Sequence, residues 1–403
     1  MPVSPSITPG ALQGVRVIDM SDESCVYGAK VLADLGADVV RIESPRGDKM
    51  RSMPPFDPKS GESMFYCFMN ANKRVVSVHL EQESGRKLFA ALVRSADIVF
   101  ESAEPGYLAG LGLAPETFRQ EKPGLIWTSV TPFGSSGPYA NWKANDLISQ
   151  AMGGLMTLTG LPERAPLKLH GEQTCYIAGL HAVSGTLVAY WHKVRTGDGQ
   201  FVDVSVHECI AHTLESAIQA YTAEGDVRSR QPRASEAGVG MYPCKDGEVF
   251  IFATSGMIAS SWRNLVAWLR TEGIPGADEL AEEKWTENKF RRSVEARARS
   301  FEIISQFTQR FNKQQLYAQL QQRGILSAPK CEIGDLFDNT QLKYLNWFTE
   351  QRFDEERTIS WPGPAFRMSE TPRRDPLPVV EVGDPSGLVE TKTAAAEQGK
   401  VLA

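Results

Sequence analysis

The sequence lacks the features that several large functional classes require. Its six cysteines show neither a CxxC pair nor zinc-type spacing, so we expect no metal site. No run reaches the roughly 18 uninterrupted apolar residues of a transmembrane helix, so we expect no membrane span. No GxGxxG motif occurs, which removes the usual dinucleotide-binding loop. The formal net charge of -6 gives no reason to expect nucleic acid or an anionic membrane as a partner.

The cysteines and the N-terminus also bear on the compartment. Scattered single thiols in a long chain are typical of a reducing environment. Residues 1–10 are rich in proline and serine and have neither the basic start nor the apolar stretch of a secretory signal. The sequence therefore predicts a cytoplasmic protein. Its 403 residues, 42% hydrophobic and 23% charged, are ordinary for a soluble chain but exceed one hydrophobic core, which favours two domains.

Strands and helices alternate through the first part of the chain. The expected order is strand 15–20, helix 26–33, strand 39–42, strand 75–78, helix 88–93, strand 98–100 and strand 125–130. Short apolar runs separated by helical patterns are typical of a mostly parallel sheet covered on both faces. We therefore predict an α/β fold with a Rossmann-like open sheet.

The second part of the chain predicts a smaller α/β domain. Its expected elements are a hairpin at 241–248 that leads into strand 249–253, and helices 261–269 and 301–323. Helix 174–192, strand 200–206 and helix 208–223 are expected before it, in the large domain. A polar stretch after the helix at 208–223 places the domain boundary. The predicted domains are 10–224 for the first part of the large domain, 225–330 for the small domain, 331–390 for the return to the large domain, and 391–403 for a mobile tail.

Several short motifs occur in an order that matches one enzyme family. They are GVRVID at 14–19, LGADVVRIE at 35–43, PRGD at 45–48, NANKR at 70–74, ADIV at 96–99, GPY at 137–139, QAMGG at 150–154 and TGDGQ at 196–200. Each is weak alone, but the ordered set resembles the family III CoA-transferases of the CaiB/BaiF type. The resemblance implies an open-sheet large domain, a small α/β domain and two subunits threaded through each other as interlocked rings.

The same resemblance draws attention to Cys175, which occupies the position of the family's nucleophilic aspartate. In the family, that carboxylate attacks the acyl-CoA carbonyl to form a mixed anhydride. CoA thiolate then attacks the aspartyl carbonyl, and the acceptor acid reverses the exchange. The side chain must supply the carbonyl that carries CoA. A thiol has no carbonyl, so Cys175 cannot replace the aspartate in this chemistry.

Three interpretations of this segment remain open from the sequence. Cys175 can be an inert buried residue at a helix start, in a subunit that no longer reacts. Glu172, one turn earlier, can be a displaced carboxylate nucleophile, or simply an acid that complements the helix dipole. Cys175 can also be an acyl-accepting thiolate activated by the helix N-terminus.

The resemblance implies further contact residues. Lys73 and Lys143 match lysines near the CoA phosphates or the adenine edge, although either can be an ordinary surface lysine. Asp146 matches an acid near the active site. CoA thioester is then a substrate, and no covalently bound cofactor is expected.

Other positions depart from the family pattern. Ser44 stands where an arginine often follows the strand, Ser102-Ala103 replaces a common Asn-Phe, and Gly110 replaces an arginine that helps to hold the nucleotide. Serine and glycine cannot replace the bidentate phosphate contacts of arginine. The glycine-rich loop of some members is reduced to Gly238-Val239-Gly240.

Together these features predict the aspartate-lacking subunit of a heteromeric CoA-transferase, with a homologous aspartate-bearing subunit as partner in an interlocked dimer or heterotetramer. The pattern is most similar to the benzylsuccinate CoA-transferases of anaerobic toluene breakdown. That similarity implies succinyl-CoA as donor and (R)-benzylsuccinate as acceptor. Two alternatives are a self-sufficient transferase that uses Glu172, and an acyl-CoA racemase or isomerase with His170 and Glu172 as the acid-base pair.

Overall fold

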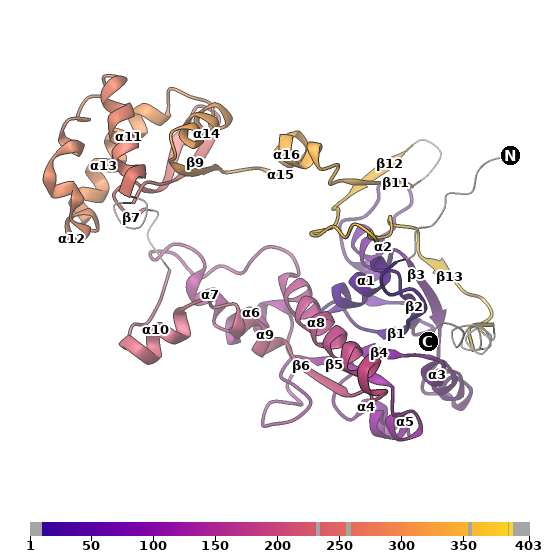
Figure 1. Cartoon of the computed structure of the whole chain (residues 1–403). Helices are drawn as coiled ribbons and strands as arrows, with labels where there is room; N and C mark the ends of the chain where they lie inside the picture. The colour runs from indigo at the N-terminus through magenta and orange to yellow at the C-terminus, as the bar shows by residue number, and fades with distance from the viewer. Residues whose placement is uncertain (1–9, 231–233, 255–258, 354–356, 386, 390–403) are drawn as a thin grey trace. The chain divides into compact units, whose positions relative to one another are not determined.

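A computed structural model describes residues 10–230, 234–254, 259–353, 357–385 and 387–389 (Figure 1). The chain divides into two compact units. The large unit contains residues 1–157, 167–227 and 346–403, and the small unit contains 158–166 and 228–345. The sequence places the corresponding boundaries at 224/225 and 330/331. The tail predicted at 391–403 lies outside the described residues.

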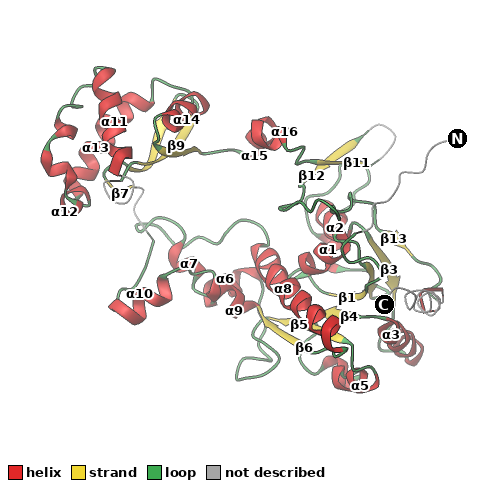
Figure 2. Ribbon diagram, viewed as in Figure 1, coloured by secondary structure: helices red, strands yellow, loops and turns green. Residues whose placement is uncertain are grey.

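The large unit is built on a seven-stranded parallel sheet, which confirms the predicted α/β class (Figure 2). In spatial order the strands are β13 (Val380–Glu381), β3 (Lys73–Ser77), β2 (Asp38–Glu43), β1 (Arg16–Met20), β4 (Ile98–Glu101), β5 (Ile126–Thr131) and β6 (Phe201–Ser205). The order from β3 to β6 is that of a Rossmann-like sheet. The last strand in sequence, β13, extends its β3 edge.

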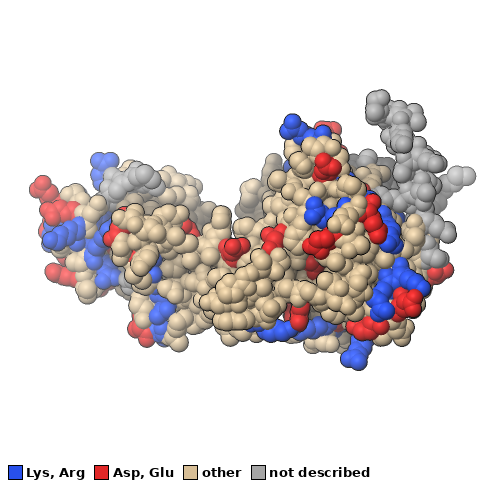
Figure 3. Space-filling model, turned by 90° about the horizontal axis from the view of Figure 1, so that it is seen from below, with Lys and Arg blue, Asp and Glu red and all other residues tan. Residues whose placement is uncertain are grey.

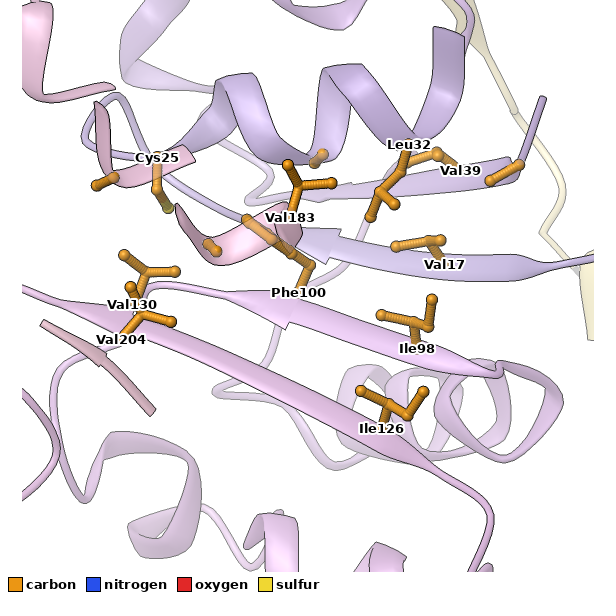
Figure 4. Packing of buried hydrophobic residues seen from close by; sticks show 14 of the residues in the cluster. Val17, Cys25, Leu32, Val39, Ile98, Phe100, Ile126, Val130, Val183 and Val204 are labelled. Carbon is orange, nitrogen blue, oxygen red and sulfur yellow. The ribbon is translucent and has the colours of Figure 1, made fainter. Parts of the chain in front are cut away.

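Helices cover both faces of this sheet, and alternate strand residues serve each face. Val17 packs in a cluster with α1 (Val26–Asp34) and α8 (Gln173–Thr196), and Figure 4 shows this packing. The next residue, Ile18, packs on the opposite face with α3 (Glu83–Ser95), α4 (Tyr107–Gly110) and α5 (Pro115–Glu121). Because both faces of the sheet are buried, the central strands consist of short apolar runs, and these runs allowed the strands to be predicted.

Two glycines let α1 and α8 approach each other at backbone distance. A Cβ atom on Gly179 would lie 2.7 Å from the Gly28 nitrogen, and one on Gly28 would lie 2.8 Å from the Gly179 oxygen. A side chain at either position would therefore push the helices apart. This crossing fixes the first turns of α8 against α1.

The remaining elements of the large unit include one correction to the sequence prediction. The single helix expected at 208–223 is wrong, because the structure has α9 (Val206–His212) and α10 (Ala217–Glu224) with a break between them. Glu215 has a φ of 55°, and this left-handed conformation cannot continue an α-helix. The other elements outside the small-unit core are η1 (Lys49–Ser52), α2 (Met64–Asn70), α6 (Asp146–Met152), α7 (Leu155–Leu158), β11 (Thr349–Arg352) and β12 (Thr358–Trp361).

The small unit packs helices on a four-stranded antiparallel sheet. The strands in spatial order are β10 (Leu326–Pro329), β9 (Gly247–Phe252), β8 (Val239–Cys244) and β7 (Ala234–Glu236). The helices are α11 (Ala259–Thr271), η2 (Glu279–Ala281), η3 (Glu283–Thr286), α12 (Asn288–Arg291), α13 (Val294–Thr308), α14 (Lys313–Gln322), α15 (Ile333–Asp338) and α16 (Thr340–Tyr344). Val249 and Ile251 alternate into the shared apolar core.

The helix predicted at 301–323 is also two helices, α13 and α14. The chain is extended at Asn312, and the Lys313 amide donates to Asp246 Oδ1 at 2.7 Å instead of to a carbonyl one turn earlier. The side chain of Asp246, from the β8–β9 turn, therefore helps to start α14. Across the described residues, no helix combines the length and apolarity that crossing a bilayer requires.

Candidate active site

The candidate site lies where the strand order of the parallel sheet reverses. β1 and β4 are neighbours, but the chain leaves β1 toward β2 and leaves β4 toward β5. The loops that follow the two strands therefore diverge, and such a switch point is where open α/β sheets bind ligands. At this point the Asp22 amide donates a hydrogen bond to Ser102 Oγ at 2.8 Å.

The Asp146 carboxylate fixes the first turn of α8. One oxygen accepts hydrogen bonds from the amide and the hydroxyl of Thr174, both at 2.9 Å. The other accepts from Gln150 Nε2 at 2.7 Å and is paired with Lys168. A carboxylate at this end of a helix is stabilised by the helix dipole. Asp146 thus makes the contacts of a helix cap to Thr174, the residue before Cys175.

Cys175 is fully buried at the start of α8. Its side chain packs among Val26, Met50, Tyr66 and Met69. Burial raises the pKa of the thiol to about 12, and a hydrogen bond from a neighbouring backbone group offsets this only in part. At neutral pH the side chain is therefore a neutral thiol in apolar surroundings, which is the environment of an unreactive cysteine.

Glu172 is the N-cap residue of α8, but its side chain makes no capping hydrogen bond. It is half-buried. Burial, and then the nearby Asp146 charge, raise its pKa, against the opposing effects of Lys168 and Lys49. A raised pKa lowers the fraction of ionised carboxylate, the form that a nucleophile needs. Glu172 as the nucleophile therefore stays a prediction.

Lys73 lies in a buried ion cluster. Its Nζ is 2.8 Å from Asp19 Oδ2, and Arg41 Nη1 is 3.0 Å from the same oxygen. Burial alone would raise the pKa of Asp19, but the two cations outweigh it and hold that pKa at about 2. Burial lowers the pKa of Lys73 to about 8, although the Asp19 charge opposes this. Its ammonium is committed to Asp19 and Asn70, so a phosphate contact from Lys73 stays a prediction.

Lys143 is exposed and pairs with Glu104, in contrast to Lys73. Glu104 lines a cavity of about 250 Å³ at the ends of β4 and β5, together with Ala103. Two more carboxylates, Glu101 and Glu116, line the same cavity, and no lysine or arginine does. The cavity next to the predicted nucleotide-contact residue is thus acidic. Lys143 reaches this cavity through Glu104, whereas Lys73 is buried at the start of β3 and pairs with Asp19.

Sequence reasoning missed two residues of this region. Glu101 is buried at the carboxyl end of β4 and accepts a hydrogen bond from the Ala103 amide at 2.6 Å. Its position at the end of a parallel strand was a usable signal. Lys168, the ionic partner of Asp146, lies in an irregular loop where no pattern marks it.

Comparison with known proteins agrees with this architecture. The model of CoA-transferase family III matches residues 12–381. The chain is 35% identical over 360 residues to the succinyl-CoA:(R)-benzylsuccinate CoA-transferase subunit BbsE of Thauera aromatica, covering 88% of this chain and 87% of that protein. It is 29% identical over 383 residues to succinate–glutarate CoA-transferase of Agrobacterium fabrum, with 93% of each chain covered. A CAIB/BAIF family protein from Brucella suis has a TM-score of 0.81 at 26% identity, with 95% of this chain and 99% of that chain covered.

Proposed function

The chain belongs to CoA-transferase family III, and we propose that within a two-chain CoA-transferase it is the subunit that does not react. The observation that carries this proposal is Cys175. It is a buried, neutral thiol at the helix start where the family resemblance places the aspartate. The catalytic carboxylate then comes from a homologous partner subunit.

The chemistry of CoA transfer supports this assignment. The nucleophile becomes an anhydride and then a thioester, and both species contain its carbonyl carbon. Attack by the Cys175 sulfur on an acyl-CoA would form only an S-acyl cysteine and release CoA. That intermediate cannot carry CoA to a second acid. Burial of the sulfur among apolar side chains opposes even this partial reaction.

The acidic cavity beside Lys143 also favours a subunit without its own reaction. A CoA nucleotide carries several negative charges, and three acidic residues, Glu101, Glu104 and Glu116, line the cavity. Burial raises the pKa of Glu101, so Glu104 and Glu116 supply the negative charge. Like charges placed against each other weaken binding. Lys143, the nearest lysine, already pairs with Glu104. We infer that CoA binds in the partner subunit and not in this cavity.

The substrates are proposed from the relative in Thauera aromatica, whose name gives succinyl-CoA as donor and (R)-benzylsuccinate as acceptor. We propose the same pair for the assembly that contains this chain. Other relatives are named for succinate with glutarate and for succinyl-CoA with mesaconate, so direct measurement of the acceptor tests this assignment.

Expression of this chain alone and together with an aspartate-bearing homologue tests the proposal. The lone chain should transfer no CoA from succinyl-CoA to benzylsuccinate, and the mixture should be active. Native mass spectrometry of the active assembly should show two kinds of chain. Cys175→Ala in the mixture should leave transfer unchanged within about a factor of two, because the thiol takes no part. A large loss with this variant, in a folded assembly, would contradict the proposal.

The same assay separates the alternatives. Transfer by the lone chain that disappears in Glu172→Gln would show that Glu172 is the nucleophile. Exchange of the acyl α-proton with solvent, without transfer to an acid, would show racemase or isomerase chemistry. Neither result is compatible with a subunit that does not react.

A further inference from the structure

A second cavity of the large unit is lined by three arginines. It has a volume of about 280 Å³ and lies in the C-terminal return of the chain, between Asn346 and Asp375. Arg367, Arg373 and Arg374 line it, against a single carboxylate, that of Asp375. The cavity of about 250 Å³ beside Lys143 is instead lined by acidic residues. On the face shown in Figure 3, acidic and basic side chains are interspersed. Three arginines that line one small cavity are therefore a local concentration of positive charge in a chain whose formal net charge is -6.

The segment that carries the arginines is held in place. The Arg374 amide donates to the Asp34 carbonyl at 2.8 Å, at the end of α1. Farther along, the backbone of Leu377 is bonded to Asn72, with Leu377 N at 3.0 Å from Asn72 Oδ1. On the other side, Trp347 Nε1 donates to the Pro364 carbonyl at 3.0 Å. The cavity walls are therefore anchored to the body of the unit, as a preformed binding site requires.

One hydrogen-bonding group of Arg374 has no partner in the part of the chain that the structure describes, and the contacts of Arg373 are long. Arg374 Nε is buried and has no hydrogen-bond partner among the described residues. Arg373 Nε is 3.5 Å from Asp34 Oδ2, but that carboxylate is shared with Lys30, whose Nζ is 3.0 Å away. A buried donor without a partner is uncommon in native proteins and calls for an explanation.

The remaining lining residues restrict the kind of anion. Phe366, Met368 and two prolines give the cavity an apolar wall, and Asn346 and Thr349 add polar groups. Guanidinium groups bind carboxylates and phosphates in bidentate fashion, while an apolar wall favours a ligand with a hydrocarbon part. The volume suits a small acid and is too small for a whole CoA molecule.

We propose that this cavity binds a small carboxylic acid with an apolar body. The identity of the acid as a substituted succinate rests on the proposed function, whereas the carboxylate site itself rests on the arginines.

Titration calorimetry on the full-length chain, in the assembly in which it purifies and without CoA, tests the site. Benzylsuccinate should bind, and Arg374→Gln and Arg367→Gln should each weaken it about ten-fold or more, since each removes a charge-assisted contact. Arg270→Gln is the matched control, because Arg270 is exposed, pairs with Asp278 and lies in the small unit. It should change binding by less than about two-fold.

Two further ligands and one further variant define the chemistry of the site. Inorganic phosphate should bind at least about ten-fold more weakly than benzylsuccinate, because it has no apolar part. Phe366→Ala should weaken benzylsuccinate and leave succinate unchanged. Equal binding of phosphate and benzylsuccinate, or wild-type affinity in both arginine variants, would overturn the proposal.

Thermal unfolding of each variant shows whether a loss of binding reflects a loss of fold. Arg367 is exposed, so Arg367→Gln carries the test if Arg374→Gln does not fold. Binding and transfer fail separately. Benzylsuccinate binding that depends on the arginines, in an assembly without transferase activity, would keep the site and reject the proposed function. CoA transfer by the assembly, together with benzylsuccinate binding that is unchanged in both arginine variants, would keep the proposed function and reject the site.

Discussion

Removal of the Asp146 carboxylate should destabilise the start of α8 more than its single charge suggests. In Asp146→Ala the Thr174 amide loses its cap, which costs about 1 kcal/mol for a typical helix N-terminus. Thr174 Oγ1 and Gln150 Nε2 also lose their acceptor, and both residues are buried. An unsatisfied buried polar group costs about 1–3 kcal/mol. We therefore expect a total loss of at least about 3 kcal/mol.

Urea unfolding followed by circular dichroism measures this loss, and hydrogen exchange at the Thr174 and Cys175 amides localises it. Glu83→Ala is a suitable control, because Glu83 forms an ion pair with Lys87 at 2.6 Å in which both side chains are about three-quarters exposed. That variant should lose less than about 1 kcal/mol. A loss below about 1 kcal/mol in Asp146→Ala, or unchanged exchange at the start of α8, would refute the capping argument.

Three other outcomes are expected. Gly179→Ala should cost about 1–3 kcal/mol because its Cβ would meet the α1 backbone, whereas Gly185→Ala in the same helix meets only a Val202 methyl group and should be close to neutral in thermal unfolding. Cys175 should resist iodoacetamide at pH 8 in the native chain because burial raises its pKa to about 12, while the exposed Cys331 is alkylated; mass spectrometry after digestion would expose a reactive Cys175. Stability should fall as the pH drops from about 4 to about 2, because the pKa of Asp19 is depressed in the folded state; Asp19→Asn should remove about 2 kcal/mol of this drop, and an unchanged pH profile would exclude the Asp19 ion cluster as its source.

The central sheet could be predicted from sequence because its strands are buried on both faces. Each appears as a short apolar run, as in Val39-Val40, and needs no long-range information. The breaks within the two longest predicted helices of the second half could not be predicted. The first break depends on the left-handed backbone of Glu215. The second depends on Asp246, which accepts a hydrogen bond from the Lys313 amide 67 residues away.

The candidate site was only partly predictable for the same reason. The motif order locates Cys175 and Asp146. In the structure Asp146 accepts a hydrogen bond from the amide of Thr174, the residue before Cys175 at the start of α8. The burial of Lys73 follows from Asp19, which is 54 residues away and gives no local signal. The arginine cavity lies in a segment without periodic pattern, so side chains that face the same space are not recognisable from their spacing.

The contact between the first strand and the end of the chain has a consequence for biosynthesis. Arg16 in β1 is buried, and its Nη1 donates to the Leu388 carbonyl at 2.5 Å. The edge of β3 is likewise occupied by β13, which is translated about 300 residues later. Until the ribosome has released nearly the whole polypeptide, that edge remains open to pairing with other nascent chains. Removal of the C-terminal residues would therefore leave β1 and β3, near the N-terminus, without these contacts.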